Sequence, residues 1–358
     1  MHPGAAGFSL PTAVLLGLAV LCGSAGVELL LLSFGFGAGR WAEFGDGGRW
    51  GRVLLVLGGA LGVAAAVSDR RLRARLTPWW FVLPALVLFG MFSWRPILYS
   101  FWVSVLDYKL GTAEHTFVGL ENFRYVLGHK DFLQIWINVG VFVGLAMVIG
   151  YPTPIILAVM INEMRRSQWW FRLGYYLPVI LPLVVVALMW KFLYAPYEGL
   201  FDSLLRWAGL EPVEWLQNEK TAMLSLVLMS TWKNAGGAMI IYLAALQGVA
   251  PQLYEAAEID GAGVWQRLRY ITIPGILPIM MILFILQIIG TFQVFVEPFL
   301  MTGGGPNQKT YTPLYFIYDL GFTRFDYGAG SAMGLILFAV LLGFTVVYFR
   351  LQRKWSGG

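Results

Sequence analysis

The stretch QGVAPQLYEAAEIDGAGVWQRLRYITIP, residues 247–274, separates two long apolar runs, Ala222–Leu246 and Ile276–Met301. Each run reaches the length of about 20 mostly apolar residues that a helix needs to cross a bilayer. The stretch between them predicts a short amphipathic helix, because Pro251 suits a first helical turn and Gly261 suits the position after a helix end. A second helical segment, Val264–Ile271, is predicted to run into the following span.

Apolar runs of this kind recur along the chain. Of its 358 residues, 58% are hydrophobic and 13% are charged, whereas soluble domains carry about 25% charged residues. The composition therefore predicts an all-α, polytopic membrane protein with about eight spans. The predicted spans are Leu10–Phe34, Gly51–Ser68, Trp79–Leu106, Ile135–Ile161, Tyr175–Tyr194, Ala222–Leu246, Ile276–Met301 and Gly330–Tyr348.

The basic residues favour one orientation of these spans, because cytoplasmic loops are enriched in Lys and Arg. The opposite orientation would place the arginine cluster at residues 70–75 outside the cell. We therefore expect both termini in the cytoplasm. The basic residues of the inner segments are then Arg70, Arg71, Arg73, Arg75, Arg165, Arg166, Arg172, Arg267, Arg269, Arg350, Arg353 and Lys354.

Several function classes are disfavoured by the residue content. The one cysteine, Cys22, predicts neither a disulfide framework nor a cysteine-based metal site. His2, His115 and His129 lie outside the predicted spans, which argues against a metal-dependent intramembrane enzyme. The sequence contains no GxxxxGK[ST] motif, so we expect no ATP hydrolysis by that route. The net charge of +5 is spread over short clusters between apolar runs, which argues against nucleic-acid binding.

The 247–274 loop resembles the EAA loop of ABC-importer permeases, in which Glu-Ala-Ala is followed at fixed spacing by Gly and then by Ile-x-Leu-Pro. Ile273 stands where that family usually has Leu. The resemblance implies a coupling helix that docks into a groove on an ATP-binding subunit. Small alanines allow close approach there, and Glu255 can pair with a basic group of the partner. The residues assigned to ATPase coupling are Glu255, Ala256, Ala257, Asp260 and Gly261. The alternative is an ordinary amphipathic surface helix.

The resemblance extends over the six spans from Trp79 to Tyr348. It is closest to the carbohydrate-uptake group (the maltose and glycerol-phosphate type), on the strength of YYLPVILPLVVVALMWKFLYAPYEGL, residues 175–200, and TGGGPNQKTYTPLYFIYDLGF, residues 302–322. It implies the type I ABC importer transmembrane fold. We expect a permease core at residues 77–358 and a two-helix extension with a basic cytoplasmic loop at residues 1–76. The sequence does not assign a role to this extension.

The resemblance also implies the partners of the chain. These are a second, homologous permease subunit, two ATP-binding subunits, an extracytoplasmic solute-binding protein and a sugar substrate. The heterodimer would lie in a bacterial-type inner membrane, in contact with lipid. ATP and Mg²⁺ would bind the partner subunits, so that no cofactor or metal and no catalytic residue is assigned to this chain.

Polar residues within apolar spans are the candidates for substrate binding, since they are costly in lipid and are expected to face a cavity. By resemblance to the larger maltose permease subunit, the substrate-binding positions are Lys233, Asn234, Gly237, Gln287, Thr291 and Val294, together with the apolar Val179 and Leu183. Trp232 and Phe292 are candidates for stacking on a sugar ring. Alternatively, Gln287 and Thr291 bond across helices, and Lys233 snorkels to the interface.

Other interpretations stay open at this stage. Arg95 in the third span could gate the path, snorkel or pair with Glu297, and we favour the structural pairing. The transported solute could be glycerol phosphate or another small molecule in place of a sugar. A secondary transporter would need no EAA loop, and an intramembrane enzyme would need a cluster of titratable residues within the spans.

Overall fold

The computed structural model describes residues 57, 81–111, 115–164 and 166–356. The chain divides into two compact units, Met1–Ile97 and Leu98–Gly358. The first two predicted spans and the predicted extension at residues 1–76 lie outside the described residues, apart from Leu57. The third predicted span matches a membrane-length helix, Phe81–Val103, which contains the π-helical turn η1 (Gly90–Trp94) and α4 (Arg95–Val103).

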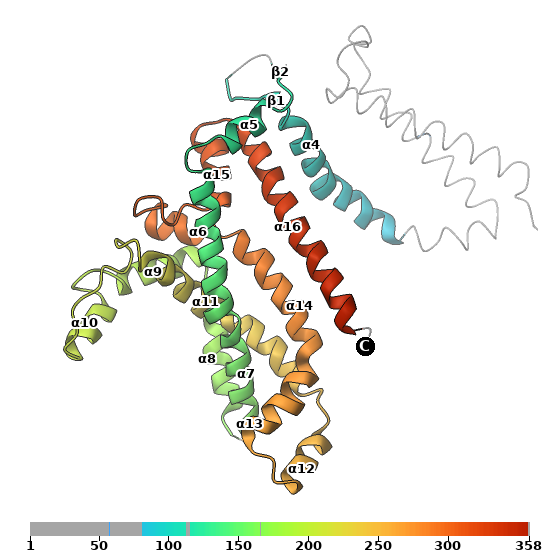
Figure 1. The fold of residues 1–358 in the computed structure, drawn as a ribbon, viewed down its shortest axis with the longest axis vertical. Coiled ribbons are helices and arrows are strands. Elements are labelled where there is room, and N and C mark those ends of the chain that lie inside the picture. Colours follow the sequence, from blue (N-terminus) through green and yellow to red (C-terminus); the bar gives the residue numbers. More distant parts are fainter. Residues whose placement is uncertain (1–56, 58–80, 112–114, 165, 357–358) are drawn as a thin grey trace, which may run out of the picture. The chain divides into compact units, whose positions relative to one another are not determined.

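The second unit is almost entirely helical (Figure 1). A short antiparallel pair, β1 (Leu106–Asp107) and β2 (Thr116–Phe117), precedes its helices. The helices and π-helical turns are α5 (Glu121–Leu127), α6 (Phe132–Leu145), η2 (Ala146–Gly150), α7 (Pro152–Glu163), α8 (Gln168–Ile180), α9 (Leu183–Leu193), α10 (Leu200–Trp207), α11 (Ala222–Leu246), α12 (Pro251–Ile259), α13 (Val264–Arg267), η3 (Leu268–Thr272), α14 (Ile273–Phe292), η4 (Pro298–Thr302), α15 (Pro313–Tyr318), η5 (Asp319–Thr323) and α16 (Tyr327–Ser356).

Among the described residues, four helices are long and apolar enough to cross a membrane, or up to six if each of two bent helix pairs counts as one span. The four are Phe81–Val103, Phe132–Glu163, Val264–Phe292 and Tyr327–Arg350. The bent pairs are α8 with α9 and α11 with α12. The prediction of an all-α, multi-span membrane protein is confirmed, and α11 has the bounds predicted for the sixth span.

Two predicted spans differ from the observed helices. The fifth, Tyr175–Tyr194, is broken between α8 and α9, whose axes differ by 101°. Pro182 causes this break, because proline lacks an N–H and pushes the preceding Leu181 into extended backbone at ψ 138°. The seventh, Ile276–Met301, ends as α14 at Phe292. Its apolar composition continues beyond that point, but the helix does not.

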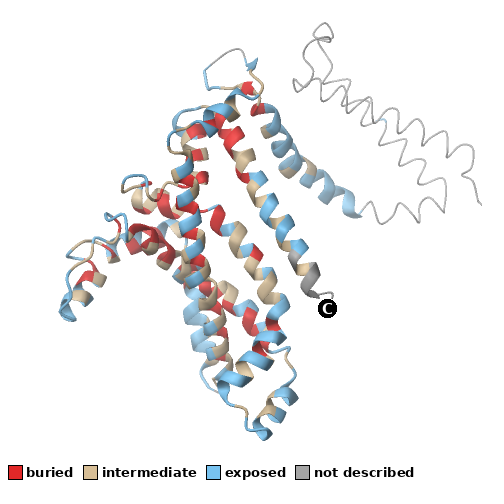
Figure 2. Cartoon of the chain, viewed as in Figure 1, coloured by how far each residue is buried: buried red, intermediate tan, exposed pale blue. Residues whose placement is uncertain are grey.

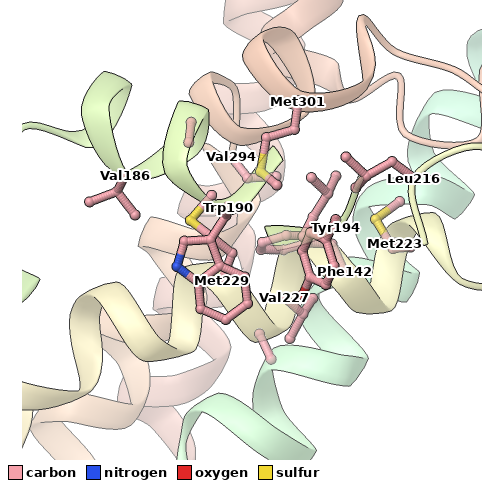
Figure 3. Close-up of a cluster of buried hydrophobic side chains, with 13 residues drawn as sticks. Phe142, Val186, Trp190, Tyr194, Leu216, Met223, Val227, Met229, Val294 and Met301 are labelled. Atoms are coloured by element: carbon pink, nitrogen blue, oxygen red, sulfur yellow. The ribbon is translucent and has the colours of Figure 1, made fainter. Parts of the chain in front are cut away.

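Three groups of buried side chains hold the second unit together. The largest lies where α6, α9 and α11 meet and includes Phe142, Trp190 and Tyr194 (Figure 3). A second joins α5 and α6 to α15 and α16, and a third joins α7 and α11 to the start of α14. Most residues of α8 and most of residues 342–350 in α16 are exposed in the single chain (Figure 2). These apolar surfaces suit lipid or another membrane subunit.

The crossing of α8 and α11 depends on one glycine and one lysine. Gly236 lies so close to α8 that an added Cβ would overlap the backbone carbonyl of Tyr175. Three residues earlier on α11, Lys233 is 8% exposed and its Nζ donates to the Val179 carbonyl at 2.9 Å. This carbonyl belongs to the last turn of α8, where carbonyls lack helical N–H partners. The Lys233 ammonium therefore caps a broken helix end.

A single carboxylate organises the loop between α9 and α11. Asp202 on α10 is fully buried. It accepts hydrogen bonds from the Tyr197 N–H at 2.8 Å, the Val213 N–H at 3.2 Å and the Trp215 indole N–H at 2.8 Å. Burial by itself would raise the pKa of this carboxyl, but the three N–H donors hold its pKa below the usual value.

Stability of this loop should therefore depend on pH and on Asp202. Because the pKa of Asp202 is lower in the folded than in the unfolded chain, its contribution is present above the unfolded pKa of 3.8 and is lost as the pH falls through the lower folded value. Asp202→Ala should destabilise the loop by about 1–3 kcal/mol, because the three donors lose their acceptor. Limited proteolysis of the purified protein between pH 3 and pH 7 measures this. Glu211→Ala, an exposed acid in the same loop, is the matched control.

Candidate functional site

The loop at residues 247–274 forms two short helices at one end of the second unit (Figure 1). α12 begins at Pro251 and ends at Ile259, as the sequence predicted. Gly261 follows with φ +73°, a left-handed conformation that glycine adopts without strain. From Val264 the helix runs without interruption through α13 and η3 into α14. The loop is therefore continuous with a membrane-length helix.

Three polar contacts hold α12 and α13 as one piece. The guanidinium of Arg267 pairs with the Glu258 carboxylate at 2.5 Å. The Tyr254 hydroxyl lies 3.0 Å from Thr272 Oγ1, which is buried in η3. Gln266 Oε1 accepts the Gly263 N–H at 2.8 Å and so caps the start of α13. α12 is therefore tied directly to the helical segment that continues into α14.

The outer face of this loop is exposed and chemically mixed. Glu255, Ala256, Asp260 and Gly261 are exposed, and Ala257 is half-buried. Within the described part of the chain, the Glu255 carboxylate makes no hydrogen bond or ion pair. Large apolar side chains surround the acids, with exposed fractions of 88% for Ile259 and 79% for Trp265. Such a surface has the composition of a protein-docking site.

A cavity of about 530 Å³ lies between the α6–η2–α7 segment, α11 and the α14–η4 segment. Four of the predicted substrate positions line it, namely Asn234, Gln287, Thr291 and Val294, and so does Leu183. A Cβ at Gly150 would lie 3.2 Å from Thr231 Oγ1 and 3.4 Å from Gln287 Nε2, so the glycine leaves room for both side chains in the wall.

The polar groups of the cavity form a short chain between α11 and the segment after α14. Asn234 Nδ2 donates to the Ser230 carbonyl at 2.8 Å and approaches Ser230 Oγ at 3.4 Å. Ser230 Oγ donates to Glu297 Oε1 at 3.2 Å. Thr291 donates its hydroxyl to the Gln287 carbonyl at 2.8 Å, within α14. The arrangement presents amide, hydroxyl and carboxyl groups to the cavity, which suits a solute rich in hydroxyl groups.

Other predicted positions lie elsewhere. Lys233 is turned toward α8, and neither Lys233, Gly237 nor Val179 lines the cavity. Trp232 packs against Trp190 with ring centroids 5.6 Å apart, and it lines a separate apolar hollow between α7, α8 and α11. The Phe292 ring contacts Phe344 of α16 at 5.1 Å. The expected stacking platform for a sugar ring is therefore not at the cavity.

Ser230 and Glu297 are the cavity residues that the sequence interpretation missed. Glu297 is 8% exposed and was considered only as a partner for Arg95. Arg95 belongs to the first unit and Glu297 to the second, so that pairing stays a prediction. The available signal was the acid itself, because a carboxyl within an apolar run is costly unless it faces a polar space.

Membrane-length helices, a polar cavity between them and a stiff, exposed loop at the end of one of them define a membrane transport permease. Residues 150–357 match the family model described as "Binding-protein-dependent transport system inner membrane component". The chain belongs to this family and is therefore a multi-pass inner-membrane protein of ABC transporters.

Named relatives and solved structures agree with this assignment. The trehalose/maltose transport system permease protein MalF of Thermococcus litoralis is 33% identical over 279 residues, which cover 76% of this chain and 92% of that protein. The sn-glycerol-3-phosphate transport system permease protein UgpA of Yersinia pestis is 33% identical over 281 residues, covering 77% and 94%. A bacterial alginate ABC transporter, solved with a periplasmic protein bound to an alginate pentasaccharide, contains a chain with TM-score 0.72 and 26% identity, covering 80% and 97%.

Proposed function

We propose that this chain forms half of the translocation path of an ATP-driven importer for a mono- or oligosaccharide. The other half is a homologous permease subunit, and an extracytoplasmic solute-binding protein delivers the sugar. Two ATP-binding subunits, which also hold Mg²⁺, supply the energy, and this chain is not itself an enzyme. Both termini lie in the cytoplasm, and residues 1–76 add a helical extension to a core at residues 77–358.

The observation that carries the coupling part of the proposal is the construction of the 247–274 loop. Its exposed acid, Glu255, is free of partners within the described residues, while Glu258 and Tyr254 are used to fix α12 to the base of α14. A docked ATP-binding subunit that changes shape would move α12 and α14 together. Since α14 carries Gln287 and Thr291, this motion reaches the cavity wall. The docking surface also includes Ala256, Ala257, Asp260 and Gly261.

The carbohydrate part rests on the cavity and on the relatives. MalF is named for trehalose and maltose, and the structural relative is an alginate transporter, solved with a periplasmic protein that holds an alginate pentasaccharide. Asn234 and Gln287 offer amide groups and Glu297 offers acceptors, which suit the directional hydrogen bonds of a polyol. Lys233 and Gly237 were expected to bind substrate, but neither lines the cavity, and Lys233 binds the Val179 carbonyl of α8.

The proposal is tested by uptake into proteoliposomes that contain both permease subunits and the ATP-binding subunits. We expect uptake of a radiolabelled sugar from a panel of maltose, trehalose and arabino-oligosaccharides. This uptake should require ATP on the cytoplasmic side and the binding protein on the other. Uptake that persists without ATP would indicate a secondary transporter and would contradict the proposal.

Cavity variants should separate substrate handling from coupling. Asn234→Leu and Gln287→Leu each remove hydrogen-bonding groups from the cavity wall, at a cost of about 1–3 kcal/mol, which corresponds to roughly 5- to 150-fold in transport efficiency. The ATPase activity stimulated by the binding protein should fall much less. Unchanged sugar affinity and rate in both variants would remove these residues from the site.

A further inference from the structure

Glu297 is the one formally charged residue among the described residues that line the cavity. Among the described residues, its carboxylate has a single side-chain partner, the hydroxyl of Ser230 at 3.2 Å. It is followed directly by Pro298 at the start of η4, and both residues are buried. A buried carboxylate with one neutral donor leaves acceptor positions that a bound solute must satisfy.

Two lysines of the surrounding helices bind backbone carbonyls and not this carboxylate. Lys191 of α9 directs its Nζ toward the Leu300 carbonyl at 3.4 Å, and its side chain is exposed. Lys233 of α11 donates to the Val179 carbonyl on the side of α8. Within the described part of the chain, no ion pair includes Glu297. The described lining of the cavity therefore contains one acidic group and no basic one.

We propose that Glu297 makes the cavity selective for uncharged polyols over anionic solutes. The inference rests on the proposed function and narrows its substrate class. A sugar hydroxyl can donate to the carboxylate, and hydrogen bonds to a charged acceptor are stronger than those between neutral groups. A phosphate dianion or a uronate carboxylate has no proton to donate and carries the same sign of charge. In a cavity of low dielectric this repulsion is felt more strongly than in water.

The neighbouring groups strengthen this selection. Ser230 Oγ uses its proton on Glu297, and the Asn234 amide N–H groups face the Ser230 oxygens. Thr291 uses its hydroxyl proton on its own helix. The protons of Ser230 and Thr291 are therefore already used within the protein, whereas the Glu297 carboxylate can still accept from a sugar hydroxyl and offers no donor to an anion. Sugar phosphates and uronates are accordingly disfavoured, although relatives of this chain are named for glycerol phosphate and alginate.

The test is equilibrium binding to the purified complex of both permease and ATP-binding subunits, with the binding protein omitted because it has its own selectivity. The probes are trehalose, maltose and arabinobiose, each against its singly phosphorylated counterpart. For any sugar that binds, the wild type should prefer the neutral form at least tenfold. Glu297→Gln keeps the size of the side chain and removes its charge, and it should reduce this preference at least fivefold.

Matched variants make the result decisive. Glu219→Gln removes a charge at an exposed position outside the cavity and should leave the preference unchanged. Gln293→Lys adds a cation to the cavity wall and should also reduce the preference, which keeps the test valid if Glu297→Gln does not assemble. Equal binding of neutral and phosphorylated forms by the wild type, or an unchanged preference in both cavity variants, overturns the inference alone. Failure of every sugar to bind or to be transported overturns the proposed function as well.

Discussion

Gly261→Val should reduce uptake roughly ten- to a hundredfold while the chain still inserts and assembles, because a β-branched residue is strained by about 1–3 kcal/mol at the left-handed backbone of this position. Gly261 has φ +73° and lies between α12 and α13. Relief of the strain would rotate α12 relative to α13 and would misplace Glu255 on the docking surface. Uptake and ATPase activity, measured on the same proteoliposomes, should become uncoupled.

The control for this prediction lies two residues away. Gly263 has φ −70°, and a Cβ added there would meet only Gln266 Oε1, at 3.9 Å. Gly263→Ala should therefore transport like the wild type. Glu255→Arg, which reverses the charge of the docking surface and leaves the backbone alone, should be as damaging as Gly261→Val. Normal uptake by both damaging variants would exclude this loop from coupling.

Gly236→Ala should lower the thermal stability of the purified chain sharply, since its Cβ would overlap the Tyr175 carbonyl of α8. Backbone cannot move aside as a flexible side chain does, so α8 must shift. Overpacking of this kind costs about 1–3 kcal/mol and occasionally more. The shift would also pull the Val179 carbonyl away from Lys233, removing a charge-assisted contact in the same crossing.

The adjacent Gly237→Ala is the matched control. Its Cβ would lie 3.9 Å from Val179 Cγ1, which is ordinary van der Waals contact. Its melting temperature should stay within a degree or two of the wild type, while Gly236→Ala should lose monodispersity in detergent on warming. Equal stability of the two variants would show that α8 and α11 do not cross as closely as described.

The parts of the fold that the sequence predicted correctly have local physical causes. Pro251 and Gly261 act through their own backbone, so the bounds of α12 followed from residue type. The length of about 20 apolar residues that a membrane span needs predicted α11 and the helix Phe132–Glu163. Hydropathy depends on composition and carries no information on the direction of a helix axis. It therefore could not show the 101° bend between α8 and α9, although Pro182 marks the break.

The residues of the cavity were likewise predicted correctly only where local helical geometry places them. Gln287, Thr291 and Val294 share a face because their spacing follows the helical period, and the structure places all three at the cavity. Lys233 and Asn234 are adjacent on α11 and so point about 100° apart. In the structure Lys233 points toward α8 and Asn234 lines the cavity. Sequence alone could not choose between them. Glu297 was missed as a cavity residue because it lies beyond the end of α14, in a segment whose path depends on tertiary packing.

The most direct measurement is cysteine crosslinking of Glu255→Cys to the ATP-binding subunit. Cys22 is the one native cysteine, and Cys22→Ser gives a clean background. The account predicts a crosslink that forms only from the cytoplasmic side and whose yield changes when ATP is added. Labelling of Glu255→Cys in intact cells by a membrane-impermeant maleimide, with no crosslink to the ATP-binding subunit, would contradict it.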